Sequence, residues 1–269
     1  MPELPEVEIV RSGLERLLSG AAVAGIDLHR RDVRRPMPAS LRTLSGPVRA
    51  VRRRAKYLCI DLDGGGILCH LGMTGSWRVA VDVRPHDHAT VRLADGRRLV
   101  YNDPRRFGVL DRLRPDGGHP DLDGLGHEPL SDDFTGAALA ACFADRRGPV
   151  KPALMDQGLV VGVGNIYAAE SLFRAGIDPR TPAGSLRRPR LDRLAHCVRE
   201  VLAEAIAAGG SSISDFRHAG GEEGWFQHAF RVYDRGGEPC LTCGTVLRGM
   251  ALGGRATVWC PRCQRQRTR

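Results

Sequence analysis

The sequence lacks any stretch that approaches the roughly 20 apolar residues needed for a membrane-spanning helix. Its N-terminus lacks a basic segment followed by an apolar run, which is the pattern of a secretory signal peptide. Internal repeats and low-complexity tracts are also missing. From these absences we expect a cytoplasmic protein that has no membrane partner.

Acidic residues are in the minority, since 31 Asp and Glu stand against 40 Lys and Arg and give a formal net charge of +9. This balance favours a polyanionic partner, with nucleic acid ahead of a membrane surface. The apolar share of 42% is ordinary for a globular protein, and 269 residues suffice for two domains with separate cores. Four cysteines stand alone among apolar neighbours and are interpreted as reduced core residues: Cys59, Cys69, Cys142 and Cys197.

The first half of the chain combines one helix with many short strands. Apolar residues recur at helical spacing from Leu4 to Leu18, and Gly20 is a typical helix end. Between Val23 and about Leu113, short runs with β character alternate with glycine-containing turns, which predicts an antiparallel sandwich or barrel. The segment 115–133 is rich in Gly, Pro and Asp, so we place a linker there.

The second half is predicted to be helical. An amphipathic helix runs from Leu191 to Ile206, and two shorter helices are expected over 153–157 and 166–175, with Asn165 as the N-cap of the second. The sequence therefore predicts an α+β fold in three parts: an N-terminal antiparallel β-sandwich with its helix over 1–130, a helical domain over 131–235 and a zinc ribbon over 236–269.

The remaining four cysteines form the strongest local motif. Two Cys-x2-Cys pairs separated by 16 residues have the spacing of a four-thiolate zinc ribbon, with Cys240, Cys243, Cys260 and Cys263 as ligands. All four positions are filled by protein, so we expect one structural Zn2+; oxidised disulfide pairs are the alternative. Residues 240–269 carry six arginines and no acid, which favours a negatively charged partner.

The start of the chain, Met1-Pro2-Glu3, offers an unusual nucleophile. Removal of Met1 turns Pro2 into a secondary amine beside a carboxylate. An α-amino group has a pKa of about 7.7–8.0, compared with about 10.4 for lysine, so a useful fraction is neutral at physiological pH. A neutral amine can attack a sugar carbon and form an iminium. On its own, the tripeptide is more typical of a plain helix start, and the rest of the chain has to decide for the nucleophile.

Three further motifs carry basic or flexible side chains. Lys56 ends the basic run 52–56, which by residue type alone is a solvated phosphate-contacting face. The segments 70–75 and 103–108 place Met73, Arg105 and Phe107 on turns, where together they are similar to side chains that fill a duplex after one base is extruded. The glycine-rich segment before Asn165 lacks the third glycine of a dinucleotide loop, and favours a phosphate cradle or a simple helix–helix turn.

Together these motifs, in order from the first residue to the zinc ribbon, resemble the bacterial formamidopyrimidine-DNA glycosylases. The resemblance rests on the segments 1–8, 54–58, 70–75, 103–108 and 162–167 and on the terminal cysteines. It implies a bifunctional glycosylase and abasic-site lyase that acts on oxidised purines in duplex DNA. It further implies a helix-two-turn-helix in the helical domain. Because each chain carries one catalytic set, we expect a monomer, associated with the nucleoid while it acts.

Residue roles follow from the same resemblance. Pro2 is implied as the nucleophile, Glu3 as the general acid–base, Lys56 as a proton donor in base release and β-elimination, and Arg255 as an aid to δ-elimination. The resemblance implies that three side chains fill the space left by the extruded base: Met73, Arg105 and Phe107. It also implies contacts with the DNA backbone for His86, Arg146, Lys151 and Asn165. The pocket around the flipped base is implied to include Glu6, Ser212 and Phe216.

Two alternatives remain open at this stage. An endonuclease VIII-like enzyme would keep the fold and prefer oxidised pyrimidines, and a damage-binding zinc protein would have no turnover. Asp234, where the family usually has Gly, and the bulky pair Trp225-Phe226 depart from the usual pattern and bear on base preference more than on the reaction.

Overall fold

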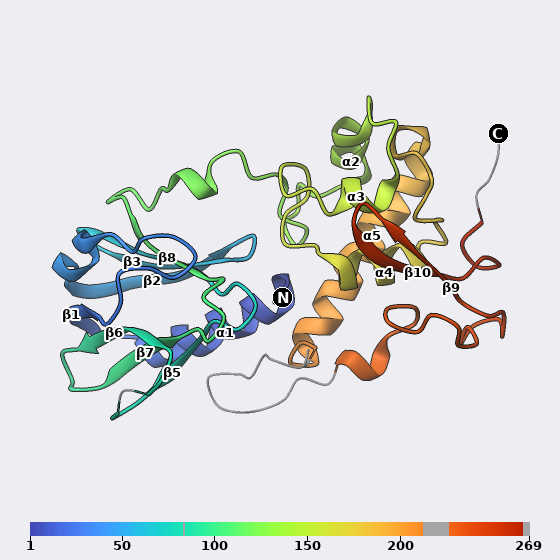
Figure 1. Ribbon diagram of the computed structural model, residues 1–269. Coiled ribbons are helices and arrows are strands. Elements are labelled where there is room, and N and C mark those ends of the chain that lie inside the picture. Colours follow the sequence, from blue (N-terminus) through green and yellow to red (C-terminus); the bar gives the residue numbers. More distant parts are fainter. Residues whose placement is uncertain (83, 212–225, 266–269) are drawn as a thin grey trace. The chain divides into compact units, whose positions relative to one another are not determined.

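The computed structural model describes residues 1–82, 84–211 and 226–265. The chain divides into two compact units (Figure 1). The first consists of Met1–Gly124 and Ala208–Trp225, and the second of Leu125–Ala207 and Phe226–Arg269. Among the described residues, no helix is both long and apolar enough to cross a membrane.

The first unit is an antiparallel β-sandwich. Its strands are β1 (Ala22–Leu28), β2 (Gly46–Arg54), β3 (Tyr57–Leu62), β4 (Gly65–His70), β5 (Ser76–Val79), β6 (Asp87–Leu93), β7 (Arg98–Asn102) and β8 (Val109–Leu113). They hydrogen-bond in the order β5-β7-β6-β1-β2-β3-β4-β8. The β1–β2 link contains just the pairs Ala22↔Pro47 and Val23↔Gly46, and the sheet folds there into two layers of four strands (Figure 1). One apolar cluster with members from both layers fills the space between them.

Helix α1 (Leu4–Leu18) packs against this sandwich. Its apolar face, which includes Val7, Val10 and Leu14, is buried in the sandwich core. The helix begins with a capping box, in which Glu3 is the N-cap and its backbone N–H donates to Glu6 Oε2 at 2.9 Å. The chain start is therefore fixed by both packing and capping.

The second unit is helical and ends in a small hairpin. Helix α5 (Arg188–Ala207) packs against α2 (Gly136–Phe143) and α4 (Asn165–Arg174), and α4 also contacts the short α3 (Val150–Leu154). Strands β9 (Arg248–Leu252) and β10 (Arg255–Trp259) form the terminal hairpin, which packs on α4. Single 3-10 turns lie at Ala39–Thr43 and Pro120–Leu122 in the first unit and at Ala183–Ser185 and Phe226–Ala229 in the second.

The predicted α+β fold is confirmed, with two local corrections. The helix expected over 153–157 is α3, which begins earlier because Pro149 serves as its N-cap and fixes an extended entry. Asn165 was wrongly expected to cap α4. Gly164 is the N-cap, since its backbone is extended and its carbonyl accepts the first helical hydrogen bond from Ala168 N at 3.0 Å.

Candidate active site and zinc centre

Strand register gathers the predicted site residues of the first unit at one end of a sheet. Lys56 lies in the two-residue turn between β2 and β3. Tyr57, just after that turn, pairs with His70 at the end of β4, and His70 pairs with Val109 at the start of β8. Because the strands are antiparallel, the Lys56 turn, the segment after His70 and the segment before Val109 all lie at this same end.

The N-terminal end of α1 lies beside the Lys56 turn. Arg53 Nε donates to Glu8 Oε2 at 2.8 Å, and Arg11 Nη1 donates to Val51 O at 3.4 Å. A later residue of α1 thus contacts an earlier residue of β2, so the helix and the strand run antiparallel to each other. Pro2 and Glu3 precede the first turn of this helix, and both are buried, as is Lys56, which has 7% of its surface exposed.

The turn that carries Lys56 is strained. Ala55 has φ +53°, in the left-handed region that favours glycine, and it is almost completely buried. Such a conformation costs on the order of 1–3 kcal/mol and persists when the surroundings determine it. A strained alanine directly before the predicted proton donor is therefore a local sign of a functional turn.

Glu6, which was predicted to line the base pocket, is completely buried and links two segments of the first unit. One carboxylate oxygen accepts the Glu3 N–H, and the other accepts from Ser211 N at 3.0 Å and Ser211 Oγ at 2.8 Å. Its side chain thereby joins the N-cap of α1 to the residue that precedes the predicted pocket segment. Ser212 and Phe216 lie outside the described residues, so the base pocket stays a prediction.

Two turns that carry the predicted void-filling side chains form one rigid structure. Gly72, next to Met73, has φ +64°. A Cβ there would lie 2.4 Å from the Phe107 carbonyl carbon, so the position requires a glycine. The buried Asp103 carboxylate accepts from Thr74 Oγ1 at 2.5 Å and from Gly108 N at 2.8 Å. Arg105 is exposed and its guanidinium lies 4.8 Å over the ring of Phe107, which is 45% exposed.

His70 is a neutral histidine at this end of the sheet. Burial, followed by the nearby positive charges of Lys56 and Arg34, lowers its pKa to about 4. Its Nδ1 can therefore accept a hydrogen bond, and it does so from Gly72 N at 3.0 Å. His70 thus supports the glycine turn beside Met73 from within the sheet.

The other predicted DNA contacts are divided between the units. His86 is exposed directly before β6 in the first unit, with φ +70°. In the second unit Arg146 is exposed and forms an ion pair with Asp156 at 3.4 Å. Asn165 is the first residue of α4, and its Oδ1 is buried with no hydrogen-bond partner among the described residues.

Lys151 is more deeply buried than a simple phosphate contact requires. It is 1% exposed, and its Nζ donates to Thr257 Oγ1 at 2.8 Å and to Ala256 O at 3.1 Å. The ammonium therefore holds β10 against α3. Its DNA contact stays a prediction, and the structure adds a positioning role that the sequence did not indicate.

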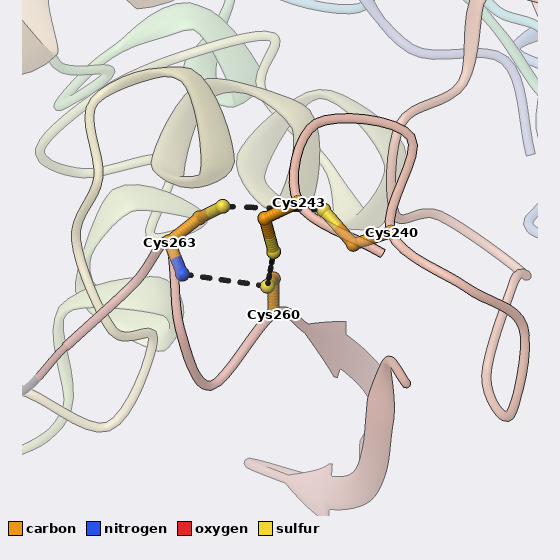
Figure 2. A group of neighbouring side chains, drawn as sticks. All are labelled: Cys240, Cys243, Cys260 and Cys263. Carbon is orange, nitrogen blue, oxygen red and sulfur yellow. Dashed lines mark hydrogen bonds between the residues drawn. The ribbon is translucent and has the colours of Figure 1, made fainter. Parts of the chain in front are cut away.

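The four clustered cysteines have the arrangement of a tetrahedral metal site (Figure 2). Their sulfur atoms all lie within 4.8 Å of one another, with Cys243 Sγ and Cys260 Sγ 3.5 Å apart and Cys240 Sγ and Cys263 Sγ 4.0 Å apart. Zn–S bonds of about 2.3 Å in a tetrahedron place sulfurs about 3.8 Å apart, whereas a disulfide requires about 2.05 Å. The site therefore fits zinc and excludes disulfide pairs.

Family comparisons agree with this geometry along the chain. Residues 1–110 match the formamidopyrimidine-DNA glycosylase N-terminal domain, residues 125–217 its H2TH domain, and residues 237–266 a zinc finger found in FPG and IleRS. The chain belongs to the formamidopyrimidine-DNA glycosylase family. The cysteine cluster is accordingly a structural zinc site.

Individual family members match over their full lengths. Formamidopyrimidine-DNA glycosylase of Bdellovibrio bacteriovorus is 50% identical, with 98% of this chain and 100% of that protein covered. The structure of MutM (Fpg) from Thermus thermophilus is 40% identical, with a TM-score of 0.87 and 98% of each chain covered. Lactococcus lactis Fpg in complex with abasic-site DNA is 33% identical, with a TM-score of 0.87 and coverage of 98% of this chain and 100% of that one.

Within this glycosylase fold, several buried polar residues were missed by sequence reasoning. Glu170 is 1% exposed and accepts backbone N–H groups from Arg231, Val232 and Tyr233 at 2.8–2.9 Å, which fixes the entry to the finger. Gln264 accepts from Cys260 N and donates to Ile177 O, both at 2.9 Å, which fixes the finger's exit. Their signal in the sequence is weak, because a polar residue in a helix or after a cysteine knuckle is usually solvated.

The finger hairpin presents Arg255 as expected. Gly253 and Gly254 have φ +58° and +72°, as a tight two-residue hairpin turn requires, and the exposed Arg255 follows directly. The tip lies near α3, since a Cβ on Gly253 would be 3.0 Å from Pro152 Cγ. Arg255 therefore stands on a hairpin that is held at its base by the zinc ligands and near its tip by α3.

Cys260→Ser should abolish zinc binding, because a hydroxyl replaces one of four thiolates in a closed site. Elemental analysis of purified protein should give about one zinc per chain for the wild type and almost none for the variant. Cys197→Ser, which alters a buried cysteine on α5, is the matched control and should keep its zinc. Full zinc content in the Cys260 variant would contradict the assignment.

Proposed function

We propose that this protein excises oxidised purines, notably 8-oxoguanine and formamidopyrimidines, from duplex DNA and then cleaves the strand at the abasic site. The observation that carries the proposal is the match of the chain to all three domains of the family, and burial of Pro2, Glu3 and Lys56 in the first unit supports it. The amine of Pro2, the carboxyl group of Glu3 and the ammonium of Lys56 are the groups that supply the nucleophile and the proton donors that the reaction needs.

The proposed chemistry begins once Met1 has been removed, and Met1 is accessible at 45% exposure. The Pro2 nitrogen bonds to C1′ of the nucleotide as the bond from C1′ to the base breaks and the base leaves with a proton. Ring opening transfers a proton to O4′, with Glu3 as the donor, and gives a cationic iminium on Pro2. The iminium withdraws electrons, so the C2′ proton is lost and the 3′-phosphate leaves.

A second elimination expels the 5′-phosphate and leaves a one-nucleotide gap. We assign Arg255 to this step because an exposed guanidinium at the tip of a rigid hairpin can bind a phosphate. The finger's excess of arginine over acid supports the same assignment. No metal chemistry is required of the zinc, which holds the hairpin.

DNA contacts are assigned to residues of both units. In the first unit, Met73, Arg105 and Phe107 fill the space of the extruded base, since inserted apolar and guanidinium groups offset the loss of stacking. His86, Arg146, Lys151 and Asn165 contact the backbone. The protein is proposed to act as a monomer on damaged or abasic duplex DNA at the nucleoid, in the cytoplasm.

Oxidised pyrimidines are the second candidate substrate class. The same Lactococcus lactis protein has been solved with DNA that contains an oxidised pyrimidine. That observation supports an endonuclease VIII-like preference as the second candidate, because the fold accommodates both oxidised purines and oxidised pyrimidines. The segment that would discriminate between them, residues 212–225, lies outside the described part of the chain.

Pro2→Gly should reduce borohydride trapping on abasic-site DNA by about tenfold or more. A primary amine gives an imine that loses its proton and becomes a poor electron sink, whereas proline gives an iminium that stays cationic. The measurement is the yield of covalent adduct, mapped to the N-terminal peptide of protein verified to lack Met1. A wild-type protein that binds this DNA without any adduct would instead be a damage-binding protein.

Lesion preference should favour 8-oxoguanine over thymine glycol. Single-turnover excision on two duplexes that differ only in the lesion measures it directly. An 8-oxoguanine rate at least about tenfold higher, or about 1.4 kcal/mol in the barrier, is expected. Faster excision of thymine glycol would establish the pyrimidine preference instead.

Lys56→Ala should separate base release from strand cleavage. If Lys56 donates a proton during base release, excision of 8-oxoguanine should fall by about 10²-fold or more, and nicking of a preformed abasic site far less. Arg49→Ala removes an exposed charge from β2 and is the matched control. Equal loss of both activities in the Lys56 variant would point to plain phosphate binding.

A further inference from the structure

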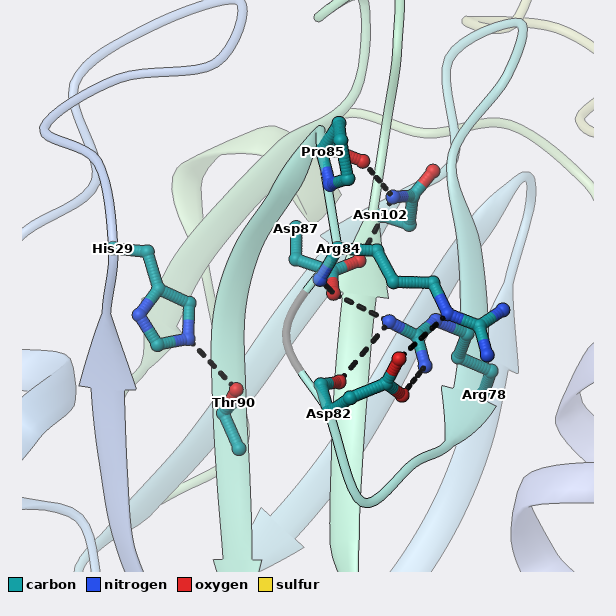
Figure 3. Close-up of polar contacts among 8 residues, drawn as sticks. All are labelled: His29, Arg78, Asp82, Arg84, Pro85, Asp87, Thr90 and Asn102. Carbon is teal, nitrogen blue, oxygen red and sulfur yellow. Dashed lines mark hydrogen bonds and ion pairs between the residues drawn. The ribbon is translucent and has the colours of Figure 1, made fainter.

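Asp87, the first residue of β6, is a buried carboxylate that the reaction does not use. Its side chain is completely buried and forms an ion pair with Arg78 on β5. It also accepts from Arg84 N at 2.7 Å and from Asn102 Nδ2 at 2.8 Å (Figure 3). Both carboxylate oxygens are therefore engaged, one by Asn102 and the other by Arg78 and Arg84.

These hydrogen bonds surround the segment that carries His86. Asn102 Nδ2 also donates to Pro85 O at 3.1 Å, so one amide group links Asp87 to the residue before His86 (Figure 3). On the other side, Asp103 N donates to His86 O at 3.1 Å. The His86 backbone is thereby held from both directions, in register with the turn that carries Arg105.

The conformation of His86 requires such support. A φ of +70° is unfavourable for a residue with a Cβ, and it persists when neighbouring contacts determine it. The side chain is exposed and lines a recess together with His29, Arg30 and Arg106. Imidazole and guanidinium groups around a recess are suited to a phosphate oxygen.

We propose that Asp87 is the positioning residue for the contact between His86 and a DNA phosphate. Through Arg78, Arg84 and Asn102 it fixes the left-handed backbone of His86 and ties it to the Asp103 turn. The inference rests on the proposed DNA contact of His86. It adds a residue that touches no DNA itself but determines where that contact lies.

Asp87→Asn tests the proposal with almost no change in volume. The asparagine side chain has one acceptor oxygen, whereas the carboxylate has two. Its NH2 group must therefore face either Asn102 Nδ2 or the Arg78 and Arg84 donors, and it cannot accept a hydrogen bond from them. Affinity for a duplex with a non-cleavable abasic analogue should fall about tenfold, and the salt dependence of log K should lose about 0.9, as for one lost phosphate contact. The single-turnover rate at saturating DNA should stay at the wild-type value.

His86→Ala and the double variant separate positioning from general destabilisation. His86→Ala should weaken binding by the same factor, and the double variant should bind no more weakly than either single variant, because both remove one contact. Asp95→Asn, which removes an exposed charge at the far end of β6, is the control. Asn102→Ala keeps the Arg78–Asp87 pair and should reproduce the weaker binding if Asp87→Asn does not fold.

Three outcomes would overturn the proposal. Wild-type affinity and salt slope in folded Asp87→Asn would show that His86 needs no such support. Additive losses in the double variant would show that Asp87 acts elsewhere. Unchanged binding in His86→Ala would remove the contact itself, and trapping through Pro2 would then still stand as a separate result.

Discussion

The pairing of Tyr57 with His70, and of His70 with Val109, is the constraint on which the first unit's site depends. A shift of one residue in either pairing would turn every side chain of β4 to the opposite face and move its turn away from Lys56. Register is secured by the apolar residues of β3 and β4, which are almost all buried. The chemistry thus depends on core packing several residues away from it.

Buried carboxylates perform the same task in four places. Glu6, Asp87, Asp103 and Glu170 are each at most 6% exposed, and each accepts hydrogen bonds from backbone N–H groups of a loop. Burying a carboxylate is costly unless its oxygens are hydrogen-bonded, and here each has two or more donors. Glu6 and Glu170 join segments distant in sequence directly, whereas Asp87 and Asp103 hold their own turns and reach more distant residues through the side chains of Asn102 and Thr74. These contacts fix loops that turn chemistry alone would leave variable. The groups proposed to meet DNA can then remain exposed, as Arg105, Arg146 and Arg255 are.

Much of this arrangement could be predicted from the sequence, for identifiable physical reasons. Helical spacing from Leu4 to Leu18 and paired cysteines at fixed separation are local signals, and both predicted their structures correctly. The N-cap of α4 was misassigned because Asn is the better cap by type, while Gly164 adopts the extended backbone. The burial of Lys151 and the links made by Glu6 and Asp87 could not be predicted from the sequence. Their hydrogen-bond partners are distant in sequence or are brought close only by the register of the strands.

Lysine usage gives a final indication of how the site works. Among 40 basic residues the sequence has two lysines, Lys56 and Lys151, and both are buried. Arginine occupies every other Lys or Arg position, including the run 52–54, which Ala55 separates from Lys56. A guanidinium binds phosphate well but does not release its proton in proteins, whereas an ammonium can do so. The proton transfer proposed for Lys56 therefore gives a reason for a lysine after an arginine run, on a strained turn, that positive charge alone does not give. At position 151 the reason for a lysine is its size. Its compact ammonium fits between Ala256 O and Thr257 Oγ1, where a planar guanidinium would need more space.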